Sequence, residues 1–537
     1  MAPSSENQPK LSVVVVAVDN DRDLQASIRS VSPIADEIVV GQIAFADAPD
    51  VAEDLTENPR ETPAGVSVRY LSLPWQQDFS AARNACLEAA SGDWLLLLDG
   101  GELLSAESLT KIGDFIAFKA DANKVYRLLI QSPAKTRADT GAQISQCRLL
   151  PNRPELHFSG PVRESLEASI AACGLESEQL DLVVTLPENG ERDDFKLRRA
   201  RMQLRVCEHI RSEETTDPRL WLARGEALAD LGEWKQAEHA FSQARRFAVE
   251  GSAELLEAYY GELRSLDREA DLQESQLTLC IEALKQFPVD VQLLCAMGNY
   301  LHQQQRIDLA TRAYQTAVRH GTIHPTSWHL TEIAQIATTC LSISLELEDR
   351  VEEARGVLED ALLEQPNSFR LRHQLIDLHV RHGRRKEAIE QVSRFPTEWP
   401  HRDALANAVR GACLAGTQNW SNAEAYLQTA FDAGCRDILC LRWLTLTHAA
   451  LEHYDAAQEI LDLWRDEEPE SQEVQKLTAS LLTRKFGQTA QAVASGSPAT
   501  LPPHFPLSPG AEGGARKRPQ KAEVHPGSMP EEAGPTG

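Results

Sequence analysis

The pattern of hydrophobic and polar residues changes once along the chain, near residue 190. Before this point, short runs rich in Val, Ile and Leu alternate with stretches of helical periodicity. Runs of this length are typical of strands, and their alternation with helices predicts βαβ units around a mostly parallel sheet. We expect strands at 13–18, 36–40, 66–71, 94–98 and 125–130, and a helix at 81–91.

From about residue 195 to 485 the strand pattern disappears and a helical repeat replaces it. Its clearest unit is WLARGEALADLGEWKQAEHAFSQA at 221–244. Small alanines let two antiparallel helices approach, and bulky residues fill the groove beside them. The spacing resembles that of tetratricopeptide repeats. A residue followed by Ala three positions later, usually a bulky one, recurs with alanines at 237, 310, 354, 388, 423 and 457.

The distances between these alanines reveal the repeat period. They are 73, 44, 34, 35 and 34 residues, and a tetratricopeptide repeat spans about 34 residues. The first distance indicates a degenerate repeat at about 255–288, and the second indicates an insertion of about ten residues near 326–345. We therefore predict about seven repeats, stacked into a right-handed solenoid with a concave surface for a protein or peptide partner.

The two patterns divide the chain of 537 residues into an α/β domain and an all-α solenoid, with unstructured ends. The last segment is rich in Pro, Gly, Ser and Ala, and it has too few periodic apolar residues to fold. The predicted boundaries are 1–10 for the leader, 11–190 for the α/β domain, 195–485 for the solenoid and 488–537 for the tail.

Composition excludes several classes of function. The 80 acidic and 54 basic residues give a formal net charge of −26, which argues against nucleic-acid binding because phosphates require a basic face. No segment has the roughly 18 apolar residues needed to span a membrane, and the leader lacks the basic start of a signal peptide, so we expect a cytoplasmic protein. The ten cysteines form no C-x-x-C pair, which predicts buried free thiols.

Three segments of the first zone share their pattern with a known family. They are LSVVVVAVDNDRDLQASIRSV, ADEIVV and LPWQQDFSAARNACLEAASGDWLLLLDGGE, and RLLPNRPELHFSGPVRE at 148–164 continues the match. They resemble the family 2 glycosyltransferases that are fused to tetratricopeptide repeats. The resemblance implies a GT-A fold, a nucleotide sugar bound across the carboxyl ends of the parallel strands, and transfer of the sugar to an acceptor recruited by the repeats. It also implies a divalent cation, Mg²⁺ or Mn²⁺, that neutralises the departing diphosphate.

The resemblance assigns contacts with the nucleotide sugar to the residues after the strands and to the first turn of the helix at 81–91. Gln42 stands where the family has an Asp facing the nucleoside, so its contact lacks charge assistance. The full set implied by the resemblance is Asp19, Asn20, Gln42, Asp47, Arg83, Asn84 and Asp99.

Two further departures concern the cation. The family's Asp-x-Asp-Glu is here Asp99, Gly100, Gly101 and Glu102, so one carboxylate is lost and Asp99 and Glu102 are left as candidate metal ligands. The family's Val-His-Glu is here Val162, Arg163 and Glu164, and an arginine has no lone pair to give to a metal.

Two hypotheses explain these losses. In the first, catalysis has been given up and the domain persists as a binding or docking module. In the second, Arg163 replaces the cation by binding the diphosphate, Arg83 assists it, and Glu164 is the general base. An ion pair without a catalytic role is the alternative for Arg163.

Overall fold

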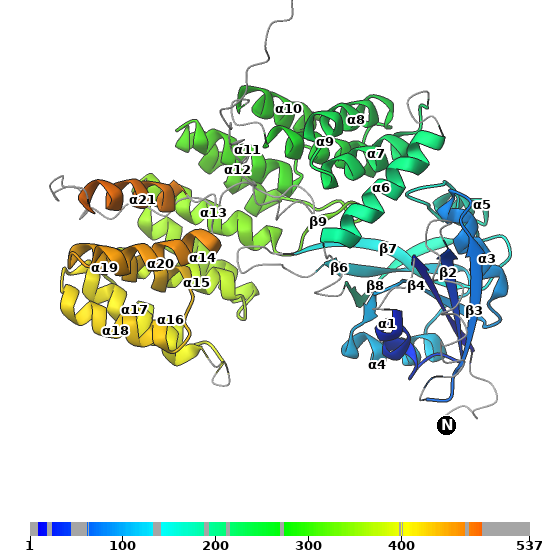
Figure 1. The fold of residues 1–537 in the computed structure, drawn as a ribbon, viewed down its shortest axis with the longest axis horizontal. Helices are drawn as coiled ribbons and strands as arrows, with labels where there is room; N and C mark the ends of the chain where they lie inside the picture. The colour runs from blue at the N-terminus through cyan, green and yellow to red at the C-terminus, as the bar shows by residue number, and fades with distance from the viewer. Residues whose placement is uncertain are drawn as a thin grey trace, which may run out of the picture.

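The structure, a computed structural model, describes residues 9–18, 24–44, 62, 64–132, 141–186, 193–210, 215–268, 273–396, 399, 401–467 and 472–485. In this part of the chain, strands and short helices extend to residue 185, and helices predominate from residue 193 (Figure 1).

The N-terminal domain is built on one mixed sheet. Its strands are β1 (Leu11–Val18), β2 (Glu37–Ala44), β3 (Ser67–Pro74), β4 (Trp94–Asp99), β5 (Leu103–Leu104), β6 (Lys124–Ser132), β7 (Ala142–Pro151) and β8 (Glu176–Thr185). Its helices are α1 (Leu24–Val31), α3 (Phe79–Ala89), α4 (Ala106–Phe118) and α5 (Glu167–Ala172).

The order of strands across the sheet is β3-β2-β1-β4-β7-β6-β8-β5. The first four in this order run parallel, as predicted, but β7 is antiparallel to both β4 and β6. The segment 133–141 that joins β6 to β7 is too short for the crossover of a dozen or more residues that parallel neighbours require. The half of the sheet that carries the predicted site is therefore entirely parallel, whereas the other half is mixed, with β6 parallel to β8 and antiparallel to β7.

Both faces of β1 and β4 are buried, which explains why each reads as an unbroken apolar run. Val13 and Val15 belong to the core that packs against α1 and α4. Val14 and Val16 belong to the core on the opposite face, against α3 and α5. Helices thus cover both faces and leave the strand ends as the accessible edge.

The helical region consists of seven helix pairs in the described residues, preceded by α6 (Asp193–His209) and followed by α21 (Gln472–Lys485). The pairs are α7 (Pro218–Asp230) with α8 (Trp234–Phe247), α9 (Ala253–Leu266) with α10 (Gln273–Gln286), α11 (Val291–Gln303) with α12 (Ile307–His320), α13 (Ile333–Leu347) with α14 (Val351–Glu364), α15 (Phe369–Arg381) with α16 (Arg385–Ser393), α17 (Arg402–Gly416) with α18 (Trp420–Asp432), and α19 (Ile438–Ala450) with α20 (Tyr454–Glu467). The pair α9 and α10 occupies the position of the predicted degenerate repeat.

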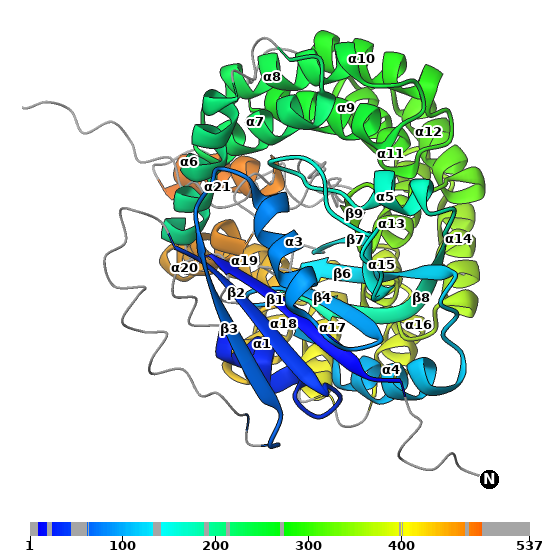
Figure 2. The same cartoon turned by 90° about the vertical axis from the view of Figure 1, so that its right-hand side faces the viewer.

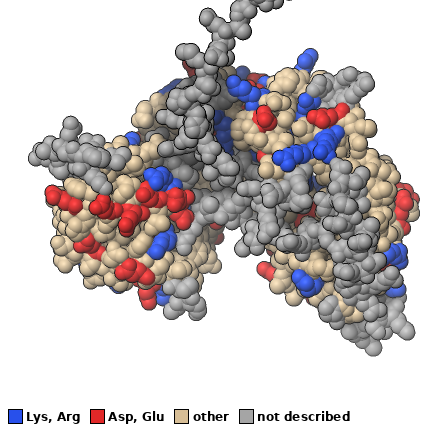
Figure 3. All heavy atoms as spheres, viewed as in Figure 1, with Lys and Arg blue, Asp and Glu red and all other residues tan. Residues whose placement is uncertain are grey.

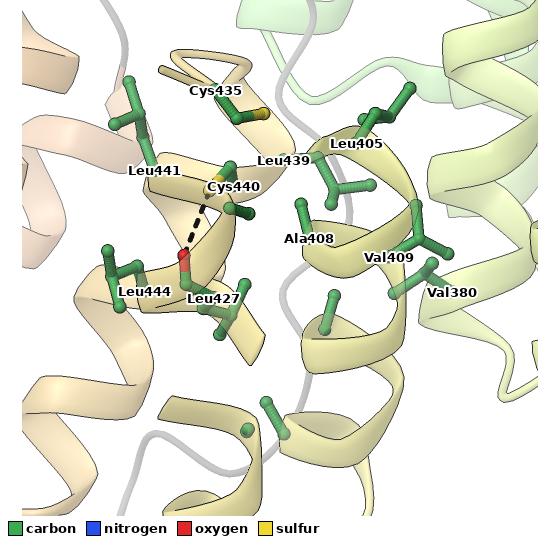
Figure 4. Packing of buried hydrophobic residues seen from close by; sticks show 14 of the residues in the cluster. Val380, Leu405, Ala408, Val409, Leu427, Cys435, Leu439, Cys440, Leu441 and Leu444 are labelled. Atoms are coloured by element: carbon green, nitrogen blue, oxygen red, sulfur yellow. Dashed lines mark hydrogen bonds between the residues drawn. The ribbon is translucent and has the colours of Figure 1, made fainter. Parts of the chain in front are cut away.

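Small residues of the repeat allow the close helix packing that the sequence predicts. The six repeat alanines, including Ala237 and Ala457, are completely buried. A Cβ added at Gly225 would lie 2.7 Å from the ring of Phe241, so only glycine fits there. Figure 4 shows the same tight packing in the C-terminal repeats, where the thiol of Cys440 lies against the carbonyl of Leu427.

The insertion lies earlier than predicted, at 321–332, because α13 already begins at Ile333. It contains β9 (His329–Leu330), which pairs antiparallel with β7. The prediction of a region without strands from 195 to 485 is therefore wrong at this point. A strand of two residues is too short to produce a recognisable alternation in the sequence.

The solenoid curves around the sheet domain and is tied to it by this insertion. Figure 2 shows an arc of helices with α5, β7 and β9 on its inner side. The backbone N–H of Ser145 donates to the carbonyl of Pro325 at 3.1 Å, and Trp328 packs against the core of the sheet domain. The repeat region thus supplies part of the sheet's own structure.

Two expectations from composition can be compared with the described residues. All ten cysteines are free and eight of them are buried, which confirms the prediction of buried thiols. No helix in the described part of the chain combines the length and the apolar character needed to cross a bilayer.

Candidate functional site

The carboxyl ends of β1, β2 and β4 lie side by side and form the edge where the sequence predicts a ligand. Ala17 of β1 is in register with Gln42, and Val16 is in register with Asp99. The backbone N–H of Gly100 donates to the carbonyl of Val16 at 2.8 Å, which fixes the turn after β4. The predicted contacts Asp19, Asn20 and Asp47 lie outside the described residues.

Five charged side chains meet at this edge and alternate in sign, and we call them the strand-end cluster. Arg83 contacts Glu164 (Nε to Oε1, 2.6 Å) and Asp99 (Nη2 to Oδ1, 2.7 Å). Arg148 contacts Glu102 (Nη2 to Oε1, 2.8 Å) and lies 3.6 Å from Asp99 Oδ2. Two arginines thus neutralise most of the charge of three carboxylates.

Local structure explains the position of Arg83. It lies in the first turns of α3, whose N-cap Asp78 accepts a hydrogen bond from the backbone N–H of Ala81 at 3.1 Å. Its guanidinium stacks over the ring of Phe158 at 5.3 Å from the centroid. The packing of α3 on the sheet therefore holds this arginine beside the end of β4.

Asn84, a predicted nucleotide contact, has a structural role here. Its amide nitrogen donates to the carbonyl of Phe158 at 3.0 Å, and its amide oxygen accepts from the N–H of Phe158 at 2.7 Å. Both polar groups of the side chain are thus engaged with one backbone residue. Asn84 anchors the 158–164 loop to α3, and the geometry gives no support to its predicted contact with a nucleotide.

Arg148 is the main member of the cluster that the sequence analysis did not single out. Its side chain is buried in β7 and also donates to Gln146 Oε1 at 2.9 Å. A charged residue inside the apolar strand CRLLP is a signal of a buried ion pair, since an unpaired charge would be costly there. The identity of its partners depends on the pairing of β7 with β4 and was not readable from the sequence.

The charged groups of the cluster shift one another's pKa values. Burial alone would lower the pKa of Arg83, but Asp99 and Glu164 raise it above its usual value. Burial would raise the pKa of Asp99, but Arg83 and Arg148 hold it well below its usual range. Burial raises the pKa of Glu102 to about 7, although Arg148 acts in the opposite direction. The cluster is therefore a set of mutually dependent charges.

These residues do not fit the predicted Mg²⁺ or Mn²⁺. Glu102 is almost completely buried, with one oxygen on Arg148 and the other accepting from the N–H of Asp99 at 2.8 Å. Gly101 has no ligand to offer, and its N–H donates to Ser27 Oγ at 2.9 Å. A hard cation requires several oxygen ligands, whereas here the carboxylates of Asp99 and Glu102 are engaged by arginines.

Arg163 and Glu164 are neighbours in sequence but face different partners. Glu164 pairs with Arg83 in the strand-end cluster. Arg163 adopts a left-handed backbone with φ of 49° and forms ion pairs with Glu226 of α7 and Glu257 of α9. Burial raises the pKa of Glu257 to about 7, while Arg163 lowers it. The charge of Arg163 is thus balanced by the solenoid, as in the ion-pair alternative, and its catalytic role stays a prediction.

Gln42 is the predicted contact with unused hydrogen-bonding capacity. Its side chain is buried at the end of β2, and Oε1 has no hydrogen-bond partner among the described residues. Buried polar atoms are nearly always paired. The position of Gln42 is therefore compatible with the nucleoside contact that the resemblance implies.

Comparison with known proteins gives one family match in the sheet domain and one more distant relative. Residues 12–139 match the family model described as glycosyl transferase family 2. A TPR repeat-containing protein of Synechococcus elongatus is 27% identical over 285 residues, which are 49% of this chain and 66% of that protein. The alignment thus covers slightly less than two thirds of this relative.

Solved structures of helical repeat proteins are also similar, at lower identity. A tetratricopeptide repeat protein from Parabacteroides merdae shares 14% identity, with a TM-score of 0.38. The similarity covers 49% of this chain and 97% of that chain. The C-terminal part of a TPR repeat-containing protein from Cytophaga hutchinsonii shares 10% identity, with a TM-score of 0.33. The similarity covers 47% of this chain and 98% of that chain.

Proposed function

We propose that this chain, which joins a family 2 glycosyltransferase domain to a tetratricopeptide-repeat solenoid, is a binding protein that has lost cation-dependent sugar transfer. The observation that carries the proposal is the strand-end cluster. Arg83 and Arg148 engage the carboxylates of Asp99 and Glu102, which a cation would need. The sheet domain then serves as a folded docking module, and the solenoid recruits a protein or peptide.

The partner is expected at the C-terminal repeats. At the other end of the solenoid, Glu226 and Glu257 bind Arg163, and Gln292 of α11 accepts a hydrogen bond from Leu330 of β9. Helices α17–α20 lie at the opposite end of the molecule from the sheet (Figure 1). Figure 3 shows a row of acidic side chains over this end, so a basic segment is the expected partner.

A second candidate function is binding or transfer of a nucleotide sugar without a cation. Two observations favour it: the unpaired Oε1 of Gln42, and the side chain of Asp99, which is 35% exposed. In this candidate Arg163 must leave Glu226 and Glu257 before it can bind a diphosphate. Glu164 must likewise leave Arg83 before it can act as a general base.

Titration calorimetry of the full chain with UDP and UDP-sugars, in Mn²⁺ and again in EDTA, separates these functions. A non-catalytic docking domain predicts no binding heat in either buffer. Binding that requires Mn²⁺ would overturn the proposal, because it would mean that Asp99 and Glu102 exchange their arginines for a cation.

Binding that persists in EDTA would replace the leading proposal with the second candidate. In that case Gln42→Leu should abolish the binding, because the substitution removes the unpaired amide oxygen. Gln203→Leu is the matched control, since the Gln203 amide donates to Ala223 within the solenoid and should leave nucleotide binding unchanged.

A further inference from the structure

The C-terminal repeats contain a second group of polar side chains that the strand-end chemistry does not use. Glu424 lies on α18, His448 lies in the last turn of α19, and His453 directly precedes α20. Glu424 Oε1 is 3.2 Å from His448 Nδ1 and 3.0 Å from His453 Nδ1. The three ligand atoms all lie within 4.8 Å of one another.

His448 is the buried member of this group. Its side chain is only 7% exposed, and the neighbour of Nδ1 is Glu424 Oε1 at 3.2 Å, in a geometry short of a full hydrogen bond. A buried ring nitrogen without a partner is unfavourable unless something else occupies its lone pair or its proton. A cation held between this nitrogen and the carboxylate of Glu424 would satisfy it.

Packing of the repeat does not require a histidine at this position. The residue nine positions before the repeat alanine is Leu228, Leu301, Leu345 and Leu414 in four of the other repeats. These leucines show that an apolar side chain suits the position. The histidine therefore replaces a residue that would pack without any unpaired polar atom.

The previous histidine in the repeat series provides an internal comparison. His379 occupies the same position relative to Ala388 as His448 does relative to Ala457, and it is likewise buried, with an Nδ1 that has no hydrogen-bond partner among the described residues. The positions that correspond to Glu424 and His453 are Arg355 and Arg384 in that repeat. Arginine cannot ligate a metal. The three ligands therefore come together at His448 and not at His379.

We propose that Glu424, His448 and His453 bind a divalent transition-metal ion of the zinc type between α18 and the α19–α20 turn. Two imidazole nitrogens and one carboxylate oxygen suit Zn²⁺ and leave one coordination position for water. Bonds of about 2.0–2.2 Å to each ligand require only small side-chain rotations from the observed spacing. The side chain of His453 is 53% exposed, which gives the ion access from solvent.

A bound ion would connect two successive repeats. Glu424 belongs to the second helix of one repeat, and the histidines lie at the turn of the next. Binding to the folded state alone raises the unfolding temperature. We therefore expect the ion to stabilise the C-terminal end of the solenoid, independently of any nucleotide at the strand ends.

The test uses the full chain, stripped with EDTA and dialysed, and then titrated with ZnCl₂ by calorimetry and with CoCl₂ by visible absorption. We expect one ion per chain at this site, with a rise in unfolding temperature. His453→Ala and Glu424→Gln should weaken binding by a factor of about 100 or more, because each removes a direct ligand and even indirect partners contribute about 10- to 100-fold.

Two further variants make the outcome decisive. His448→Leu introduces the residue found in other repeats, so it should fold normally and fail to bind. His382→Ala removes a histidine that pairs with Glu346 at 2.9 Å, and it should bind like the wild type. The proposal is overturned if the wild type binds no stoichiometric Zn²⁺, or if His453→Ala binds Zn²⁺ as tightly as His382→Ala.

Discussion

The strand-end cluster and the Arg163 contact use the same chemistry, arginine between carboxylates, at two different boundaries of the sheet domain. Arg83 and Arg148 pair with acids of their own domain. Arg163 pairs with Glu226 and Glu257 of the solenoid. The first contacts hold the ends of the strands together, whereas the second holds two domains in one arrangement.

Burial separates the two regions energetically. The side chains of Arg148 and Glu102 are 7% and 3% exposed, whereas those of Arg163 and Glu226 are 23% and 38% exposed. Glu257 is only 9% exposed, so solvent screens the Arg163 contact more strongly on its Glu226 side. Arginines at the predicted site thus serve two structural purposes. The buried ones stabilise the sheet domain, and the more exposed Arg163 contributes to the contact between the domains.

The largest expected effect is that of Arg148→Met, which breaks the buried part of the cluster. Met fills the space but leaves Glu102 without its cation, so we expect a loss of about 3–5 kcal/mol in the free energy of unfolding. Urea unfolding followed by circular dichroism measures it. Arg29→Met removes an exposed arginine of α1 and should change stability by less than about 0.5 kcal/mol. Similar values for both variants would contradict the role assigned to the cluster.

Asp290 of the solenoid is a buried carboxylate whose pKa is shifted in the opposite direction to that of Asp99. Asp290 caps α11 and accepts hydrogen bonds from the Tyr260 hydroxyl and the Leu293 N–H, and burial raises its pKa to about 6. Folding therefore favours its protonated form. Its contribution to stability is present near pH 4 and is lost as the pH rises through 6. The pKa of Asp99 is lowered, so its contribution is instead lost as the pH falls.

Asp290→Asn tests this difference, because Asn caps helices as well as Asp and does not titrate. Relative to the variant, the wild type should lose up to about 3 kcal/mol of stability between about pH 4 and pH 7. Urea unfolding at several pH values provides the measurement. Parallel pH profiles for the two proteins would show that Asp290 is not buried in a raised-pKa state.

The smallest effect is expected for Arg163→Ala, which breaks the contact between domains. We expect a loss of about 1–2 kcal/mol, because the contact is partly exposed. Hydrogen exchange of the Ser145 and Thr331 amides, which bond across the same boundary, should become faster than in the wild type. The exposed Arg246→Ala serves as the control in the solenoid. Unchanged exchange in both variants would mean that the insertion alone holds the domains together.

Much of the fold could be predicted because it follows from local periodicity. The apolar run of β1 and the alanine spacing of the repeats each report a regular element and its buried face. The candidate site was less accessible. Gln42 and Asp99 lie at the ends of strands, and their contact with a nucleotide stays a prediction. Asn84 bonds the Phe158 backbone, and the sequence around Arg148 gave no sign of its partners.

The sequence alone determined the two domains, the parallel strands and the repeat period, because each leaves a regular spacing of apolar or small residues along the chain. Tertiary structure decided which charges meet. Arg163 and Glu257 are 94 residues apart in sequence, and Gln143 of β7 and His329 of β9 are 186 residues apart. No periodic pattern encodes such pairs, since they arise only when the solenoid curves around the sheet and brings its inner helices to the 158–164 loop.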